Sequence, residues 1–243
     1  MDGGQHASDL QLSEEQVQKL IRGGQKTPKL MFPVWSRHVA GSEAGALYEA
    51  TKRAIDLFFV ISAIVIFAPV MLLIVVAIKL DSAGPLFFAH QRTGRNGKRF
   101  NVLKFRTMVV DADARKAELA HLNELEWPDF KITNDPRVTR VGRILRRTSL
   151  DELPQLFNIL RGEMSLVGPR PCSITVEKYE YWQYRRLDVI PGMTGPAQLW
   201  RRHSDFAQKC EMDIAYIEHR SLLLDLYLIF QTARMVLLAP TGK

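Results

Sequence analysis

The feature that most constrains this chain is a run of 22 residues without a charged side chain, Leu57–Ile78. At about 1.5 Å per residue, a straight helix of this length crosses the roughly 30 Å hydrocarbon core of a bilayer. The residues alone therefore favour a single membrane-spanning helix.

Two features of this run argue against a simple span. Pro69 lies near its middle and lacks the backbone N–H that would bond to the Val65 carbonyl, which favours a break. Basic residues also stand on both sides of the run: Lys52 and Arg53 before it, and Lys79, Arg92, Arg95, Lys98 and Arg99 after it. The positive-inside rule then assigns both ends to the cytoplasm, as in a helix that enters one leaflet and returns.

Composition indicates an anionic partner. The 243 residues carry a formal charge of +7, which suits nucleic acid, a phospholipid surface or a phosphorylated substrate. The two cysteines, Cys172 and Cys210, lack CxxC spacing, so we expect free thiols and neither a disulfide nor a metal site built on them.

The first 45 residues read as a polar extension. Within it, Ser13–Arg22 is typical of a short helix, because Ser13 and Gln16 can form a capping box. The start of the sequence does not show the pattern of a signal peptide. Two interpretations fit this segment: an extension without a role of its own, and an arm that docks onto a partner.

A β-hairpin is predicted for residues 84–106. Its arms are apolar or alternating, and Gly94–Gly97 between them has strong turn chemistry. The second arm ends in Lys104, Phe105 and Arg106. A cationic rim over lipid headgroups would explain these basic residues.

Three later segments are predicted to be helical. Asp111–Leu125 should form a surface helix. It is followed by an arginine stripe with apolar residues opposite, typical of an amphipathic helix that binds anionic lipid or phosphate; the stripe is Arg137, Arg140, Arg143 and Arg147. Leu222–Leu238 is apolar but contains Asp225 and Arg234, so it should lie in the membrane interface. The aromatic residues of 179–184 could stack a uracil base or form an interfacial belt.

The densest cluster of charged residues runs from Gly142 to Pro171. It places Asp151 and Glu152 among five arginines: Arg143, Arg146, Arg147, Arg161 and Arg170. Ser149 and Glu152 fit a capping box, so we expect a helix to begin here. Two carboxylates do not require five arginines, and a diphosphate held by forked guanidinium groups explains the excess better.

These motifs resemble the bacterial sugar transferases, the polyprenyl-phosphate hexose-1-phosphate transferases or monotopic phosphoglycosyl transferases. The resemblance rests on SLDELPQLFNILRGEMSLVGPRP, GPLFFAHQRTGRNGKRFNVLKFRTM, NDPRVTRVGRILRR and PGMTGPAQ, in that family's order along the chain. It covers roughly Tyr48 to Leu238.

The resemblance implies a monotopic α+β protein that is mainly helical, with a re-entrant helix, a small β-hairpin and interfacial amphipathic helices. The corresponding segments are a polar extension (1–45), a membrane-associated helix (46–81) and a cytoplasmic catalytic domain (82–243). The membrane break falls at Ala68-Pro69, where many family members have Ser-Pro. The expected location is the cytoplasmic face of the bacterial inner membrane.

The resemblance also implies the chemistry. Asp151 and Glu152 are the expected catalytic residues, with Asp151 as the nucleophile and Glu152 as the ligand of Mg²⁺. The residues expected to bind substrate phosphates or to border the site are Lys104, Arg106, Arg143, Arg146, Arg147 and Arg170. The enzyme would transfer a sugar-1-phosphate from a UDP-sugar to polyprenyl (undecaprenyl) phosphate and release UMP.

The implied partners are these two substrates and membrane lipid, without nucleic acid; a homodimer is left open. Two other functional classes remain. One is a membrane-tethered module that binds anionic lipid or nucleic acid without catalysis, for which Asp151→Asn would be silent. The other is a scaffold that has kept the fold and lost the chemistry.

Overall fold

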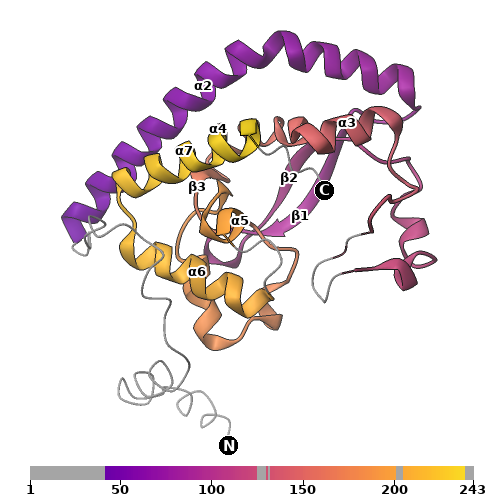
Figure 1. Cartoon of the computed structure of the whole chain (residues 1–243). Coiled ribbons are helices and arrows are strands. Elements are labelled where there is room, and N and C mark those ends of the chain that lie inside the picture. The colour runs from indigo at the N-terminus through magenta and orange to yellow at the C-terminus, as the bar shows by residue number, and fades with distance from the viewer. Residues whose placement is uncertain (1–41, 125–129, 131, 201–204, 239–243) are drawn as a thin grey trace, which may run out of the picture. The chain divides into compact units, whose positions relative to one another are not determined.

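The computed structural model describes residues 42–124, 130, 132–200 and 205–238, all of which belong to one unit spanning residues 34–243 (Figure 1). The predicted helix Ser13–Arg22 and nearly all of the predicted extension lie outside the described residues. The described part is mainly helical and contains a small β-hairpin, as expected for the fold class.

The apolar run lies inside one long helix, α2 (Ser42–Asp81), which contains Pro69. The ribbon of α2 is continuous but bends along its length, and Pro69 is its one proline (Figure 1). Among the described residues, Gly45–Asp81 is the one helix long and apolar enough to cross a membrane.

The predicted hairpin is confirmed. Strands β1 (Phe87–Thr93) and β2 (Arg99–Phe105) pair antiparallel, with Phe87 opposite Phe105 and Thr93 opposite Arg99. The turn between them contains a 3-10 helix, η1 (Arg95–Gly97), in which Asn96 has a φ of 55° and Gly97 a φ of 73°. Asn and Gly are the residues that most readily adopt these left-handed angles.

The predicted helix Asp111–Leu125 is wrong. Its described residues form turns and two 3-10 helices, η2 (Ala114–Lys116) and η3 (Ala120–Leu122). In an α-helix the amide of Lys116 would bond to the carbonyl of Ala112. Here that carbonyl accepts a hydrogen bond from Nη1 of Arg137 at 3.0 Å, and the Lys116 amide bonds to Asp113 instead. A tertiary contact thus overrides the helical propensity of this segment.

The middle of the chain contains two short helices joined by a turn. They are α3 (Arg140–Thr148) and α4 (Gln155–Leu160), and the 3-10 helix η4 (Leu150–Glu152) connects them. Thr139 caps α3 by accepting from the Gly142 amide at 2.9 Å. Arg137 precedes α3, so only part of the predicted arginine stripe is helical.

The third part of the chain includes a second, parallel pair of strands, β3 (Ser165–Val167) and β4 (Gly192–Thr194). Between them lie the 3-10 helices η5 (Val176–Lys178) and η6 (Tyr181–Leu187). The chain continues through α5 (Pro196–Trp200), α6 (Phe206–His219) and α7 (Leu222–Leu238).

Helix α7 is apolar on both its buried and its exposed sides, and its predicted position in the membrane interface stays a prediction. Leu224 and Leu228 are buried, whereas Leu223, Leu226 and Phe230 are exposed. Asp225 does not interrupt the helix, because its carboxylate is buried and accepts hydrogen bonds from Tyr48, Lys52 and Tyr216.

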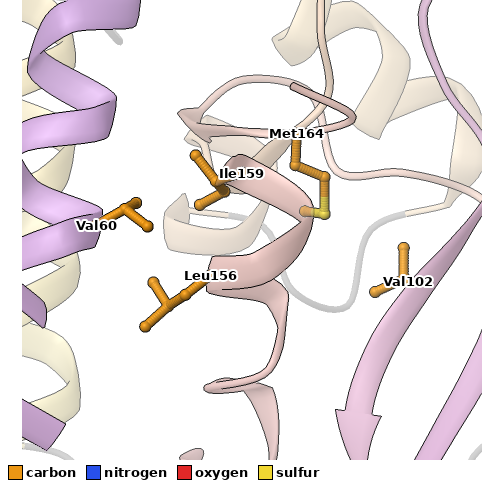
Figure 2. Packing of buried hydrophobic residues seen from close by; sticks show 5 residues of the cluster. All are labelled: Val60, Val102, Leu156, Ile159 and Met164. Atoms are coloured by element: carbon orange, nitrogen blue, oxygen red, sulfur yellow. The ribbon is translucent and has the colours of Figure 1, made fainter. Parts of the chain in front are cut away.

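Helix α2 contributes to two separate core clusters. Val60 packs with Val102, Leu156, Ile159 and Met164, and Figure 2 shows it pointing from α2 toward the two side chains of α4. Ile74 and Ile78 pack with Phe105 and Leu145 in the second cluster. The stretch of α2 between the clusters is largely exposed, including Val65 and Ile66 at 69% each.

Polar contacts hold both ends of α2 to the same body. Near its start, Lys52 pairs with Asp225 at 2.9 Å, and Arg53 donates to the carbonyls of Ile159 and Leu160. At its end, the carboxylate of Asp81 accepts from the amide of Val141 at 3.0 Å. The apolar middle of α2 therefore lies between two anchored ends.

Candidate active site

The acidic pair lies in η4, between α3 and α4. Ser149 ends α3 with a left-handed φ of 57° and makes no side-chain capping bond, so the predicted capping box does not form. The reason is tertiary, because Oε1 of Glu152 contacts two cationic side chains instead of the backbone amide of Ser149. The tight turn at Ser149 leaves Asp151 buried and Glu152 partly exposed.

Two cations from distant segments contact Glu152. Nζ of Lys104, at the end of β2, lies 2.7 Å from Oε1 of Glu152 and 3.7 Å from Oδ2 of Asp151. Nη2 of Arg170, from the loop after β3, lies 3.1 Å from the same Oε1. Three segments that are far apart in sequence therefore converge on this pair.

Arg146 is the arginine of α3 that turns toward the site. It is partly buried, and its Nε donates to Oγ1 of Thr107 at 2.9 Å. Burial lowers the pKa of Arg146, while the nearby charge of Asp151 raises it. The guanidinium is thus positioned to compensate charge beside Asp151.

The two carboxyl groups differ in acidity. Burial alone would raise the pKa of Glu152, but Arg170 and Lys104 outweigh it and lower that pKa to about 2. Burial raises the pKa of Asp151, and Glu152 adds to this effect, while Lys104 and Arg146 oppose it. Glu152 is therefore the more firmly ionised member of the pair.

The other predicted phosphate ligands lie elsewhere. Arg143 and Arg147 are on the exposed face of α3 beside Ile144, which is 63% exposed. The guanidinium of Arg106 is buried and donates to the carbonyls of Ser82 and Ala83. The structure thus brings Lys104, Arg146 and Arg170 to the acidic pair. Phosphate binding by Arg106, Arg143 and Arg147 stays a prediction.

Two glycine-containing loops position Arg170. The amide of Gly168 bonds to the Thr194 carbonyl at 2.9 Å, and the amide of Gly192 bonds to the Pro169 carbonyl at 2.9 Å. A Cβ on Gly192 would lie 2.0 Å from the nitrogen of Gly168. The Gly168–Pro171 loop and the segment Pro191–Pro196, which contains β4, therefore pack backbone against backbone, and this contact fixes the backbone next to Arg170.

Asn158 is not among the site residues predicted from the sequence. This α4 side chain is fully buried and accepts from the Leu103 amide at 3.0 Å. It also donates to the carbonyl of Asn101 and to Glu163, each at 2.7 Å. Asn158 thus fixes the backbone of β2 next to Lys104. An amide inside the apolar pattern LPQLFNIL is the sequence signal that could have identified it.

The acidic pair suits Mg²⁺ better than a metal that needs several protein ligands. Mg²⁺ prefers oxygen ligands and commonly uses one or two carboxylates together with substrate phosphates. Among the described residues there is no group of three or more His, Cys, Asp or Glu side chains that could hold a metal. Oε1 of Glu152 accepts hydrogen bonds from Lys104 and Arg170, and the ionised carboxylate of Glu152 is the oxygen donor in this pair that best fits Mg²⁺.

A small cavity of about 40 Å³ lies elsewhere, between the first half of α2 and the segment around β3 and α6. Its polar lining includes Glu49, Lys52, Asp56 and Arg220, and neither Asp151 nor Glu152 borders it. The candidate active site is therefore the charged cluster around Glu152, and this cavity is not part of it.

Known proteins resemble this chain over the segments that build the charged cluster. The profile of the bacterial sugar transferase family matches residues 47–239. Undecaprenyl-phosphate galactose phosphotransferase of Salmonella typhimurium is 42% identical, over 76% of this chain and 40% of the relative. Exopolysaccharide production protein ExoY of Rhizobium meliloti is 40% identical, over 77% of this chain and 86% of the relative.

A third relative is named for both a nucleotide-sugar and a lipid phosphate. UDP-N-acetylgalactosamine-undecaprenyl-phosphate N-acetylgalactosaminephosphotransferase of Aeromonas hydrophila is 36% identical, over 82% of this chain and 48% of the relative. The chain spans about two fifths of the length of several curated relatives that it matches. The matched residues include every segment that builds the charged cluster, and the chain belongs to the bacterial sugar transferase family.

Proposed function

We propose that this protein transfers a sugar-1-phosphate from a UDP-sugar to undecaprenyl phosphate or another polyprenyl phosphate. UMP is released, and the product is a polyprenyl-diphosphate sugar, formed in the first membrane step of glycoconjugate assembly. The observation that carries the proposal is the acidic pair Asp151-Glu152, held among Lys104, Arg146 and Arg170. The names of the relatives support the same class of donor and acceptor.

The reaction proceeds in two displacements at one phosphorus atom. A carboxylate oxygen of Asp151 bonds to the phosphorus that carries the sugar, and the bond to the bridging diphosphate oxygen breaks, so UMP leaves with the electron pair. An oxygen of polyprenyl phosphate then attacks the same phosphorus, and Asp151 leaves as a free carboxylate. Each step is an in-line phosphoryl transfer.

The neighbouring residues have two roles, which are to stabilise charge and to bind the metal ion. Lys104, Arg146 and Arg170 stabilise negative charge on the transferred phosphoryl group, because preorganised cations are most effective in a partly dry site. Glu152, ionised beside Lys104 and Arg170, would hold Mg²⁺. When bound, Mg²⁺ supplies further neutralisation of the diphosphate charge.

The anchoring of α2 supports a re-entrant membrane helix. One body contacts Lys52 and Arg53 at the start of the helix and Asp81 at its end. A helix that crossed the bilayer would separate these two ends by the thickness of the membrane, and the contacts could not coexist. We therefore place the exposed middle of α2 in one leaflet, with the catalytic residues at the cytoplasmic headgroup level where a lipid phosphate lies.

Acceptor-free incubation tests the covalent mechanism. Purified protein with Mg²⁺ and a panel of UDP-sugars should release UMP up to the molar amount of enzyme. Intact mass should rise by one sugar-phosphate, mapped to the peptide that contains Asp151. Asp151→Asn should abolish both signals, and Glu152→Gln should slow them severely.

The controls separate the alternatives. Direct attack by the lipid phosphate in a ternary complex predicts no UMP and no adduct until the acceptor is added. A membrane-tethered binding module predicts no turnover with any UDP-sugar, even when acceptor is present, and an Asp151→Asn variant that behaves as the parent protein does.

A further inference from the structure

A buried ion pair lies directly behind the loop that presents Arg170. Nε of Arg186, in η6, lies 2.6 Å from Oδ2 of Asp213, in α6. The side chain of Arg186 is 5% exposed, and that of Asp213 is fully buried. Nη2 of the same guanidinium donates to the main-chain carbonyl of Arg170. A continuous series of contacts therefore runs from α6 through Arg186 and Arg170 to Glu152.

The guanidinium of Arg186 has little freedom to turn away from these partners. Asp213 binds it at Nε, the Arg170 carbonyl binds it at Nη2, and the ring of Phe206 lies 5.4 Å from its central carbon. A buried ion pair is a costly way to join two helices, because desolvation can exceed the Coulombic gain and a well-packed apolar pair is often no less stable. The Arg186–Asp213 pair is explained if it has a second task, which is to orient the backbone carbonyl that Nη2 of Arg186 binds.

The Arg170 loop needs such an anchor on its far side. The bonds of Gly168 and Gly192 hold the backbone before Arg170, and the amide of Thr93 holds the carbonyl of Cys172 at 2.8 Å. Between these points, Arg186 holds the carbonyl of Arg170 itself. A long, flexible arginine side chain reaches a fixed target only if its Cα is held, since small displacements of a catalytic group are costly.

We propose that Arg186 and Asp213 are positioning residues of the active site, which hold the main chain of Arg170 so that its guanidinium reaches Glu152. Measurement of UMP release as a test of this role rests on the proposed function, whereas measurement of hydrogen exchange does not. Asp213 keeps the Arg186 fork in place, and Arg186 transmits this constraint to the Arg170 loop. Neither residue touches the acidic pair directly.

A second ion pair provides a matched control. Arg185 and Glu218 join the same two elements, η6 and α6, at 2.8 Å, but Arg185 is exposed. Its guanidinium does not contact the Arg170 carbonyl. Arg185→Gln therefore removes a cross-link between η6 and α6 without removing the constraint on Arg170.

The first test is independent of activity. Hydrogen exchange at the amides of Thr93 and Gly192, which bond to the carbonyls of Cys172 and Pro169 on either side of Arg170, should be faster in Arg186→Lys, because the single ammonium nitrogen of lysine cannot occupy the positions of both Nε and Nη2. Asp213→Asn, which preserves shape and removes the charge, should have the same effect and replaces Arg186→Lys if that variant does not fold. Exchange in Arg185→Gln should match the parent protein. Unchanged exchange in the folded Arg186 and Asp213 variants would overturn the proposal.

The second test uses acceptor-free UMP release. Arg186→Lys and Asp213→Asn should be slower by about 10- to 100-fold, as is typical when the residues that orient a ligand are lost. Adding Arg186→Lys to Arg170→Ala should change the rate by less than about twofold, because the two act in series. Multiplicative losses in the double variant would show that Arg186 acts independently of Arg170.

The two tests fail in distinguishable ways. If the parent protein releases no UMP from any UDP-sugar, with or without acceptor, the proposed function is wrong, and hydrogen exchange alone decides whether Arg186 positions the loop. If UMP is released but Arg185→Gln is as slow as Arg186→Lys, general loosening of η6 explains both effects. The positioning role is then wrong.

Discussion

Nζ of Lys104 lies 2.7 Å from Oε1 of Glu152, although the two residues are 48 positions apart in sequence. The same ammonium group lies 3.7 Å from Oδ2 of Asp151. One cation thus contacts a firmly ionised carboxylate while remaining close to a second one whose pKa is raised. The ionisation of Asp151 therefore depends on Lys104.

The pH dependence of the first step follows from this arrangement. Burial raises the pKa of Asp151, and attack on phosphorus requires the ionised carboxylate. Acceptor-free UMP release should therefore fall as pH decreases through a pKa above the ordinary value of about 3.9. Because Lys104 lowers this pKa, Lys104→Gln should move the midpoint to higher pH. It should also reduce the maximal rate by about 100-fold.

A charge-conserving variant controls for this prediction. Lys104→Arg keeps a cation beside Asp151 and should leave the midpoint closer to that of the parent protein. A pH profile of single-turnover UMP release decides the point, and a midpoint that does not move in Lys104→Gln contradicts it.

The buried side chain of Asn158 should contribute to the stability of the fold. Asn158→Leu leaves the Leu103 amide, the Asn101 carbonyl and Glu163 without their partner, at about 1–3 kcal/mol for each buried group left unpaired. Thermal unfolding in detergent should show a lower Tm. The exposed side chain of Asn101 allows Asn101→Ser as a control, which should unfold like the parent protein.

The contact between the two loops should not tolerate a side chain. Gly192→Ala places a Cβ against the backbone nitrogen of Gly168, and a backbone atom cannot move aside as a flexible side chain would. We expect a loss of about 1–3 kcal/mol in unfolding free energy and slower UMP release, because the Arg170 loop is displaced. Gly45→Ala has no atom within 4 Å of the new Cβ and should not lower the Tm.

Membrane topology can be tested at the two anchored ends of α2. Ala50→Cys and Ala83→Cys, each made in a chain whose native Cys172 and Cys210 are replaced, place single exposed thiols before Lys52 and after Lys79. An impermeant reagent should label both from the cytoplasmic side. Labelling of one position only from the opposite side would show that α2 spans the membrane.

Pro69→Leu tests the cause of that geometry. Restoring the missing hydrogen bond and removing the proline clash is worth about 3 kcal/mol. This can change the ratio of two topologies by roughly a hundredfold. The same labelling should then reveal a spanning population. Identical labelling in Pro69→Leu would mean that the contacts of Lys52, Arg53 and Asp81 set the geometry instead.

Several elements could be predicted because local patterns dictate them. Turn chemistry at Gly94–Gly97 between two apolar arms specifies the hairpin, since Asn96 and Gly97 accept left-handed angles. The uncharged run Leu57–Ile78 specifies the long apolar helix α2. The motif around Asp151 and Glu152 indicates the family and the acidic pair without any knowledge of the fold.

Tertiary structure decided which of the many cations reach that pair. Arg143 and Arg146 look equivalent in sequence, but Arg143 is exposed, whereas Arg146 is partly buried and donates to Thr107. Arg106 binds the carbonyls of Ser82 and Ala83, although it is only two residues from Lys104. The Ala112 carbonyl is bonded to Arg137, so a sequence with helical propensity forms 3-10 turns. Short-range sequence patterns do not predict these contacts, because the contacts join residues that meet only after the chain has folded.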